Sequence, residues 1–108
     1  MYGIFCFMDI ILNNNVEVFI GTLEKQTLAK ILRTLDLLEQ FGHMLAMPHS
    51  KKIASDLFEL RIRGIQEVRL FYTIHHGHAV VLHGIIKKSE RIPTKDIALL
   101  KQRRKELD

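Results

Sequence analysis

Residues 57–91 hold three segments whose apolar and polar residues predict β-strands. In the first segment, residues 57–63 (LFELRIR), apolar and polar residues alternate from Phe58 onward. Successive side chains of a strand point to opposite faces, so Glu59, Arg61 and Arg63 should project together from one face. The other face should pack on the core, and it holds Phe58, Leu60 and Ile62.

Two further strands are predicted after this one, over residues 67–75 and 79–87. Both segments are rich in β-branched and aromatic residues, and short connections join them to their neighbours. Gly64 lies in the first connection and Gly77 in the second, as tight turns require. The three segments therefore predict an antiparallel β-sheet.

A helical spacing of apolar residues precedes these strands. The spacing i, i+3, i+4 and i+7 predicts a helix that Thr22 caps, that ends near Phe41 and that Gly42 follows. A shorter helix is predicted over residues 16–20, with Asn15 as its cap. The buried stripe of the longer helix should consist of Leu28, Ile31, Leu32, Leu35 and Leu38.

The remaining segments complete the predicted order of elements. Residues 2–11 predict an N-terminal strand, residues 44–56 an irregular segment, and residues 94–107 a helix that begins after Pro93. The order is strand, two helices, three strands and a final helix. Helices that precede an antiparallel sheet are typical of an α+β fold, and the length suits one domain over residues 1–108.

Positive charge is concentrated in the second half of the chain. The net charge is +4, but residues 1–40 carry −2, whereas residues 83–108 carry eight cations and four acids. A polyanionic partner should therefore dock on the C-terminal half. Charge alone also fits a lysine-rich surface that only contacts solvent.

The N-terminal residues bear on the compartment of the protein. Cys6 is the one cysteine, so no disulfide can form within the chain, and a reducing, cytoplasmic location is expected. We interpret Cys6 as a small core residue. The apolar run of residues 1–8 lacks a basic start and stops at Asp9, so it predicts neither a signal peptide nor a membrane span.

Each predicted strand delivers a cation to the same region. Arg61 and Arg69 lie in the first two strands, and the lysine pair 87–88 ends the third. A concave site built from such cations suits a phosphodiester backbone, because guanidinium groups bind phosphate oxygens bidentately. The alternative is that the arginine tips are solvated, or paired with Glu59 or Glu67.

The order of motifs LFELRIR, VRLFY and VVLHGIIKKSERIP resembles the RelE/ParE toxin superfamily, and its HigB-like toxins in particular. The resemblance covers nearly the whole chain. It implies that the catalytic and phosphate-binding cations are Arg61, Arg69, Lys87 and Lys88. We expect Arg61 and Arg69 to be exposed strand residues that can be replaced without unfolding the protein.

The resemblance implies the toxin of a type II toxin–antitoxin pair, an endoribonuclease that cuts mRNA on the ribosome. Its protein partner would be an antitoxin with a helix-turn-helix domain, and no cofactor is expected. One alternative is a ParE-like inhibitor of DNA gyrase, and another is an inactive relative that only binds RNA or an antitoxin. The residues expected to contact RNA are Lys51, Lys52, Arg63, Arg91, Lys101 and Arg104.

Three further residues have two interpretations each. Glu59 is either a general base or an ion-pair partner that orients Arg61, and a carboxylate beside arginines is the weaker base. His83 is either a catalytic acid–base group or a buried, hydrogen-bonded side chain, with Leu82 on the opposite face of the strand. Tyr72 faces away from Arg69 and is predicted to lie in the core with its hydroxyl at an edge.

The histidines around Gly77 do not predict a metal site. His75, His76 and His78 match no spacing of a zinc site, and neither cysteine nor an acidic cluster accompanies them. We interpret them as exposed residues of a hairpin.

Overall fold

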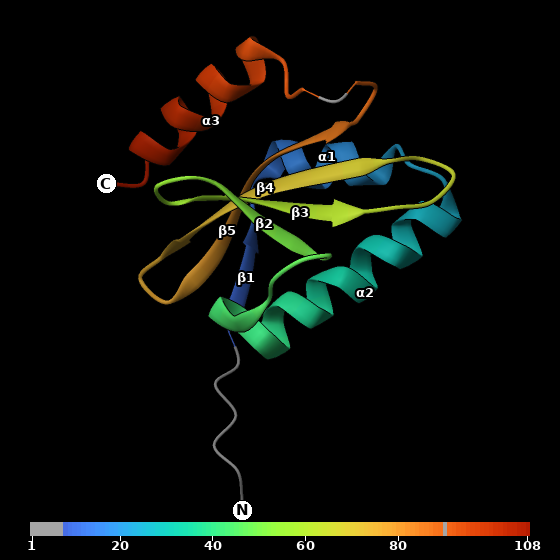
Figure 1. The fold of residues 1–108 in the computed structure, drawn as a ribbon, viewed down its shortest axis with the longest axis horizontal. Coiled ribbons are helices and arrows are strands. Elements are labelled where there is room, and N and C mark those ends of the chain that lie inside the picture. The colour runs from blue at the N-terminus through green and yellow to red at the C-terminus, as the bar shows by residue number, and fades with distance from the viewer. Residues whose placement is uncertain (1–7, 90) are drawn as a thin grey trace, which may run out of the picture.

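A five-stranded sheet with helices on both faces forms the molecule (Figure 1). The computed structural model describes residues 8–89 and 91–108. Helices α1 and α2 cover one face of the sheet, and α3 lies over part of the other. The elements are β1 (Asp9–Leu12), α1 (Asn14–Gly21), α2 (Lys25–Phe41), the short 3₁₀ helix η1 (Gly42–Met44), β2 (Ser50–Ala54), β3 (Leu57–Ile62), β4 (Val68–His75), β5 (His78–Ile86) and α3 (Thr94–Lys105).

The α+β fold predicted from the sequence is confirmed. The strands lie in the order β1-β5-β4-β3-β2, and β2 to β5 form an antiparallel meander. The sheet as a whole is mixed, because β1 pairs in parallel with β5. The predicted strand over residues 2–11 is seen from Asp9 onward, and Cys6 lies outside the described residues.

Strand β2 corrects the prediction that residues 44–56 are irregular. Residues 50–54 pair with β3 at the edge of the sheet, where Lys51 and Lys52 are exposed. A short edge strand that carries lysines lacks the apolar alternation of an inner strand, and the lysines discourage pairing with another chain. The local pattern of residues therefore did not predict this strand.

The helix boundaries differ slightly from the predicted ones. Asn13 and Glu24 precede the first residues of α1 and α2, in place of the predicted caps Asn15 and Thr22. Thr22 Oγ1 instead donates a hydrogen bond to the Phe19 carbonyl, at 2.7 Å. Of the predicted stripe on α2, Leu32 is exposed, because the helix contacts the sheet along one narrow line.

The turns and the core follow the predicted pattern. Gly42 has a φ of +52° after α2, and His76 and Gly77 have positive φ values in the two-residue loop between β4 and β5. The larger apolar cluster lies between the sheet and the first two helices, and Leu60 and Ile62 belong to it as predicted. A smaller cluster under α3 consists of Leu57, Phe71, Val80, Leu82 and Leu100.

Helix α3 contributes only one fully buried side chain, Leu100, to the smaller cluster. Its Ile97 is exposed, and Leu107, which follows the helix, is half-buried. Because the helix covers only part of this face, the ends of β3, β4 and β5 beyond it remain open to a polar site.

Candidate functional site

Cross-strand pairing brings the predicted cations to the face of the sheet that α3 partly covers. Residues that are directly opposite each other on neighbouring strands share a face. Arg61 pairs with Arg69, and Arg69 pairs with Ile85 on the next strand. Glu59 pairs with Phe71 in the adjacent row, so the predicted polar face of β3 is the face that carries the site.

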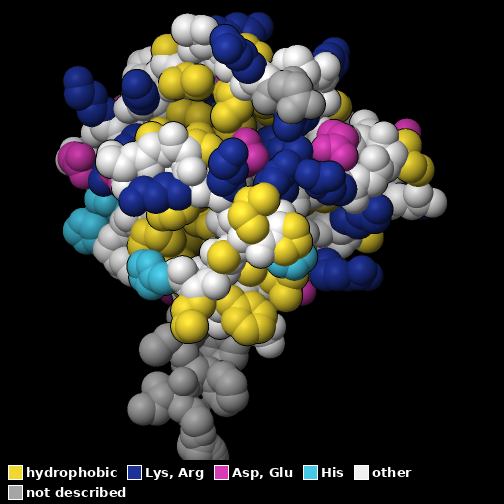
Figure 2. Space-filling model, viewed as in Figure 1, with side chains coloured by type: hydrophobic (Ala, Val, Ile, Leu, Met, Phe, Trp, Pro, Cys, Tyr) yellow, Lys and Arg dark blue, Asp and Glu magenta, His cyan; other side chains and the backbone are white. Residues whose placement is uncertain are grey.

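An open hollow of about 440 Å³ lies at the end of these rows. Figure 2 shows Lys and Arg side chains gathered across this face, with acidic side chains between them. We call this feature the cationic hollow. It is lined by Arg61, Arg63, Glu67, Arg69, Lys87, Lys88 and Ser89.

Arg69 is buried beneath the hollow, with 1% of its surface exposed. Its Nη2 lies 3.2 Å from Glu67 Oε2, its Nε lies 3.4 Å from Glu59 Oε1, and its Nη1 donates to the Val68 carbonyl at 3.1 Å. The expectation that Arg61 and Arg69 are exposed was wrong, because Arg69 lies on the central strand between β3 and β5, and Arg61 is half-buried. The charge of Arg69 is largely compensated by two carboxylates.

Glu59 lies between the two strand arginines. Its Oε1 is 3.5 Å from Arg61 Nε and 3.4 Å from Arg69 Nε, and the residue is buried. Neither Nε has a partner with hydrogen-bond geometry among the described residues. Of the two interpretations of Glu59, this geometry favours the ion-pair partner. The Glu59 carboxylate is buried, and its Oε1 lies between the two guanidinium groups.

Cations other than Arg69 reach the opening of the hollow. Arg63 and Lys88 are exposed, Lys87 is half-buried, and the Arg61 side chain keeps 15% of its surface accessible. The Lys87 amide donates to the Glu67 carbonyl at 2.6 Å, which fixes the backbone where β5 ends. An anion that enters the hollow would meet these side chains first.

A β-bulge decides where His83 points. His83 pairs with Phe71 but Val81 pairs with Tyr72, so Leu82 is the additional residue. Leu82 and His83 therefore both face α3, and the expectation that they lie on opposite faces was wrong. The His83 ring stacks on Phe71 with 6.3 Å between the ring centres.

Two residues of α3 hold the His83 ring. His83 Nε2 lies 2.8 Å from Asp96 Oδ1, and Arg103 Nη1 lies 3.2 Å from His83 Nδ1. Since a guanidinium only donates, Nδ1 accepts, and the neutral ring donates from Nε2 to Asp96. Of the two interpretations of His83, this arrangement fits the hydrogen-bonded side chain, because both ring nitrogens have hydrogen-bond partners.

The remaining predicted RNA contacts are scattered. Lys51 pairs with Glu59 and shares the face of the site, whereas Lys52 pairs with Phe58 and points to the opposite face. Arg104 hydrogen-bonds Asp56 and Asp108, which raise the pKa of its guanidinium. Neither Lys101 nor Arg91 lines the cationic hollow, although both are exposed.

Tyr72 lies in the core, as predicted. Its hydroxyl is 2.6 Å from Ser50 Oγ, and its ring stacks on Phe58. Burial raises the pKa of the Tyr72 hydroxyl above its ordinary value, and the hydrogen bond with Ser50 only partly opposes this rise.

Glu67 was predicted only as a possible ion-pair partner of an arginine. The structure has this pair, since Glu67 Oε2 lies 3.2 Å from Arg69 Nη2, and Glu67 also lines the hollow. Asp96 and Arg103 were missing from the predicted site. They hold His83 from α3, and no local pattern connects a helix residue with a strand that lies before it.

The described residues contain neither a candidate metal centre nor a membrane-spanning helix. Among residues 8–89 and 91–108, no group of three or more His, Cys, Asp or Glu side chains could hold a metal ion. None of the described helices is both long and apolar enough to cross a bilayer. His78 Nδ1 lies 3.5 Å from Asp9 Oδ2, while His76 is exposed in its turn.

Comparison with known proteins places the chain in a family. Residues 18–105 match the family described as "Phage derived protein Gp49-like". No curated protein matches the chain. The resemblance to the RelE/ParE toxins is thereby confirmed at the level of the superfamily, and the narrower HigB-like likeness stays a prediction. The chain belongs to the phage-derived Gp49-like family, within the RelE/ParE-like toxin superfamily.

Proposed function

We propose that this protein is the toxin of a type II toxin–antitoxin pair and that it cleaves mRNA on the ribosome. Membership of the Gp49-like family is consistent with a toxin. The observation that carries the nuclease proposal is the cationic hollow, in which side chains of β3, β4 and the end of β5 converge. The protein partner would be an antitoxin, and a HigB-like subfamily would fit the strand motifs.

The chemistry that suits this hollow is attack by an adjacent 2′-hydroxyl. The 2′-oxygen loses its proton and bonds to phosphorus, the bond from phosphorus to the 5′-oxygen breaks, and the leaving oxygen takes up a proton. The products are a 2′,3′-cyclic phosphate and a 5′-hydroxyl. Extra negative charge forms on the phosphate during this step, and cations fixed in a partly dry site stabilise it without reorganisation.

The geometry supports a division of labour among the cations. Arg61 and Arg63 would contact the scissile phosphate, and Lys87 or Lys88 would assist the leaving oxygen or contact ribosomal RNA. Arg69 would act from below, since its guanidinium is enclosed by Glu59 and Glu67. The His83 ring is less suited to a proton transfer, because both of its nitrogens already have partners.

Primer extension on mRNA after brief expression tests the proposal. Wild type should halt protein synthesis and produce cuts within translated regions. Arg61→Ala should lower the cleavage rate about a hundredfold or more, the usual result of losing one transition-state contact. Lys25→Ala is the matched control, because Lys25 is exposed and lines no part of the hollow.

The contrary outcomes are equally concrete. Full cleavage by Arg61→Ala would show that the hollow is not the active site. Intact transcripts together with trapped gyrase–DNA complexes would support the ParE-like alternative. Toxicity with neither mRNA cuts nor trapped gyrase–DNA complexes would reject both the nuclease proposal and the ParE-like alternative.

A further inference from the structure

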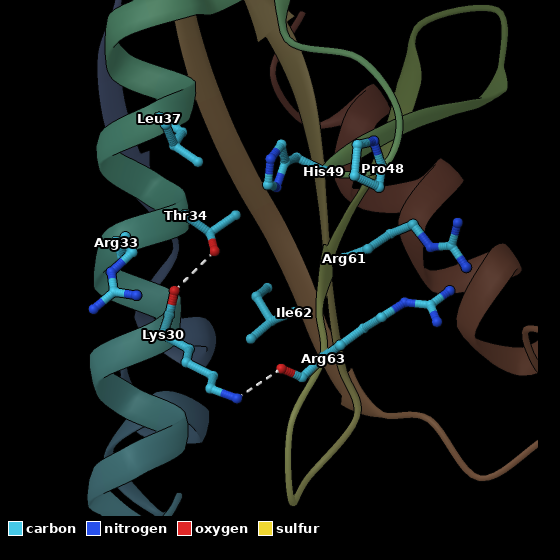
Figure 3. A pocket seen from close by; sticks show the side chains of 9 residues that line it. All are labelled: Lys30, Arg33, Thr34, Leu37, Pro48, His49, Arg61, Ile62 and Arg63. Carbon is cyan, nitrogen blue, oxygen red and sulfur yellow. Dashed lines mark hydrogen bonds between the residues drawn. The ribbon is translucent and has the colours of Figure 1, made fainter.

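A groove of about 270 Å³ separates α2 from the end of β3 (Figure 3). Lys30, Thr34 and Leu37 line it from α2, and His49 and Ile62 line it from the opposite side. In Figure 3 the side chains of Leu37, Ile62 and His49 point into the space between the two elements. We call this feature the α2 groove, and its lining combines aliphatic side chains with cationic ones.

Positive charge borders the α2 groove. Four of its lining residues are cationic, and among the described residues no carboxylate lines it. The guanidinium ends of Arg61 and Arg63 point away from α2, so their stems border the groove while their charges serve the cationic hollow (Figure 3). Lys30 Nζ donates to the Arg63 carbonyl at 3.0 Å, and Arg33 has no ion-pair partner in the described part of the chain.

An exposed apolar surface continues the groove past the end of α2. Phe41, Met44 and Met47 are 53%, 85% and 56% exposed, and Phe41 lies one helical turn after Leu37. Met47 Sδ accepts a hydrogen bond from Arg61 Nη1 at 3.6 Å, so this surface reaches a residue that lines the cationic hollow. In Figure 2 hydrophobic side chains gather over η1 and the loop that follows it.

This composition is typical of a protein interface. Aromatic residues, methionine and arginine are enriched at interface centres, whereas aspartate and glutamate are depleted. Methionine also adapts its shape to a partner at low energetic cost. An RNA strand would fit the groove less well, because stacking of bases needs aromatic rings. His49 is the one aromatic residue among those that line the groove, and Phe41 lies beyond its end.

We propose that the α2 groove, together with Phe41, Met44 and Met47, is the docking surface for a protein segment that presents acidic and apolar side chains. The acidic side chains would pair with Arg33 and Lys30, and the apolar ones would cover the aliphatic lining and the methionines. Such a segment lies against Arg61 and Arg63, so it competes with RNA for the cationic hollow. That the segment belongs to the antitoxin rests on the function proposed above.

The test selects peptides from a random, phage-displayed library on the immobilised full chain. Enriched peptides should combine acidic and apolar residues, and a labelled copy should bind wild type in a fluorescence anisotropy titration. Arg33→Glu should weaken this binding about tenfold or more, because like charges would face each other. Met44→Ala combined with Met47→Ala should weaken it as well.

Two controls match these changes. Lys25→Glu reverses an exposed charge at the start of α2, and Val18→Ala trims an exposed apolar residue on α1. Both should bind the peptide as wild type does. The peptide should also displace a labelled single-stranded RNA from wild type.

The opposite results overturn the proposal. Failure to enrich acidic peptides, or equal binding by Arg33→Glu, would mean that the docking surface takes no such segment. RNA binding that depends on Arg33, with no enriched peptide, would mean that the groove continues the RNA site. Peptide binding that leaves RNA binding unchanged would refute the competition. If the enriched peptide binds as expected but the protein never cleaves mRNA, the docking surface stands and the proposed nuclease function is rejected.

Discussion

Arg69 shows how a single buried charge supports the candidate site. The guanidinium lies under the hollow and contacts Glu59 and Glu67, so it fixes two carboxylates and, through Glu59, the Arg61 side chain. A substitution there would change folding as well as chemistry. Loss of toxicity by Arg69→Ala would therefore say little about catalysis, and Arg61 and Arg63 are better probes.

Arg69→Ala should lower the free energy of unfolding by roughly 3–5 kcal/mol, because it leaves Glu59 buried without its closest cation. Arg63→Ala, at an exposed position, should change it by less than about 0.5 kcal/mol. Urea denaturation followed by circular dichroism measures both. Adding Glu59→Leu to Arg69→Met should restore much of the stability, and a double variant as unstable as Arg69→Ala would contradict this account.

Tyr72 gives the stability of the protein a dependence on alkaline pH. Its folded pKa is raised above the ordinary value of 10.0 by burial, so the unfolded chain releases this proton first. The neutral hydroxyl therefore contributes fully to the free energy of unfolding below the ordinary pKa. This contribution is lost as the pH rises through the pKa of the folded state.

Tyr72→Phe tests this dependence. The variant should be less stable than wild type by about 1 kcal/mol at neutral pH, since Ser50 Oγ loses its partner. The difference in stability between the two proteins should narrow as the pH rises above 10. Only wild type loses stability there, because its Tyr72 hydroxyl ionises more readily in the unfolded chain. Urea denaturation at a series of pH values measures it, and a constant difference would mean that the Tyr72 pKa is ordinary.

Helix α3 is attached to the sheet mainly by polar contacts. Its one fully buried side chain is Leu100, whereas Asp96 and Arg103 hold His83 and Arg104 holds Asp56. The bulge at Leu82 makes this possible, because it turns His83 toward the helix. A helix anchored in this way should open more easily than the strands beneath it.

Asp96→Ala should therefore loosen α3 selectively. Hydrogen exchange at the amides of residues 94–105 should speed up, while the amides of β3 and β4 should keep their protection. Glu106→Ala is the control, since Glu106 is exposed and its side chain makes no hydrogen bond or ion pair among the described residues. Uniform loss of protection would show instead that Asp96 supports the whole fold.

The molecule as a whole carries its charge asymmetrically. Residues 83–108 carry eight cations and four acids, whereas residues 1–40 carry a net charge of −2. In the view of Figure 2, Lys and Arg side chains lie over the sheet and over α3. Two of the α3 cations already have partners, since Arg103 donates to the Leu82 carbonyl and Arg104 to Asp56. RNA should consequently meet the cations of the hollow before those of the helix.

The salt dependence of RNA binding tests this order. Replacing Arg63, Lys87 and Lys88 by glutamine should flatten the log–log salt slope by about 0.7 for each lost phosphate contact. Replacing Lys101 and Lys105 should change the slope little. Fluorescence anisotropy with a single-stranded RNA across a salt series gives both slopes, and an equal flattening by the helix pair would place RNA on α3.

Most elements of the fold could be predicted from local patterns. The alternation in residues 57–63, the glycine turns and the helical spacing before Phe41 depend on residues that are neighbours in the chain, and strand and helix geometry convert them directly into faces. The same alternation placed Arg61 and Glu59 on one surface, which is the core of the candidate site.

Tertiary structure decided what these residues can do. The burial of Arg69 follows from strands on both sides of β4, and β2 formed without an apolar pattern because β3 offered it a free edge. The bulge at Leu82 places Leu82 and His83 on the same face, where strict alternation predicted opposite faces, because the additional residue interrupts the alternation of side chains. Sequence periodicity is set by the backbone of a single element, whereas burial, ion pairing and register depend on which elements become neighbours.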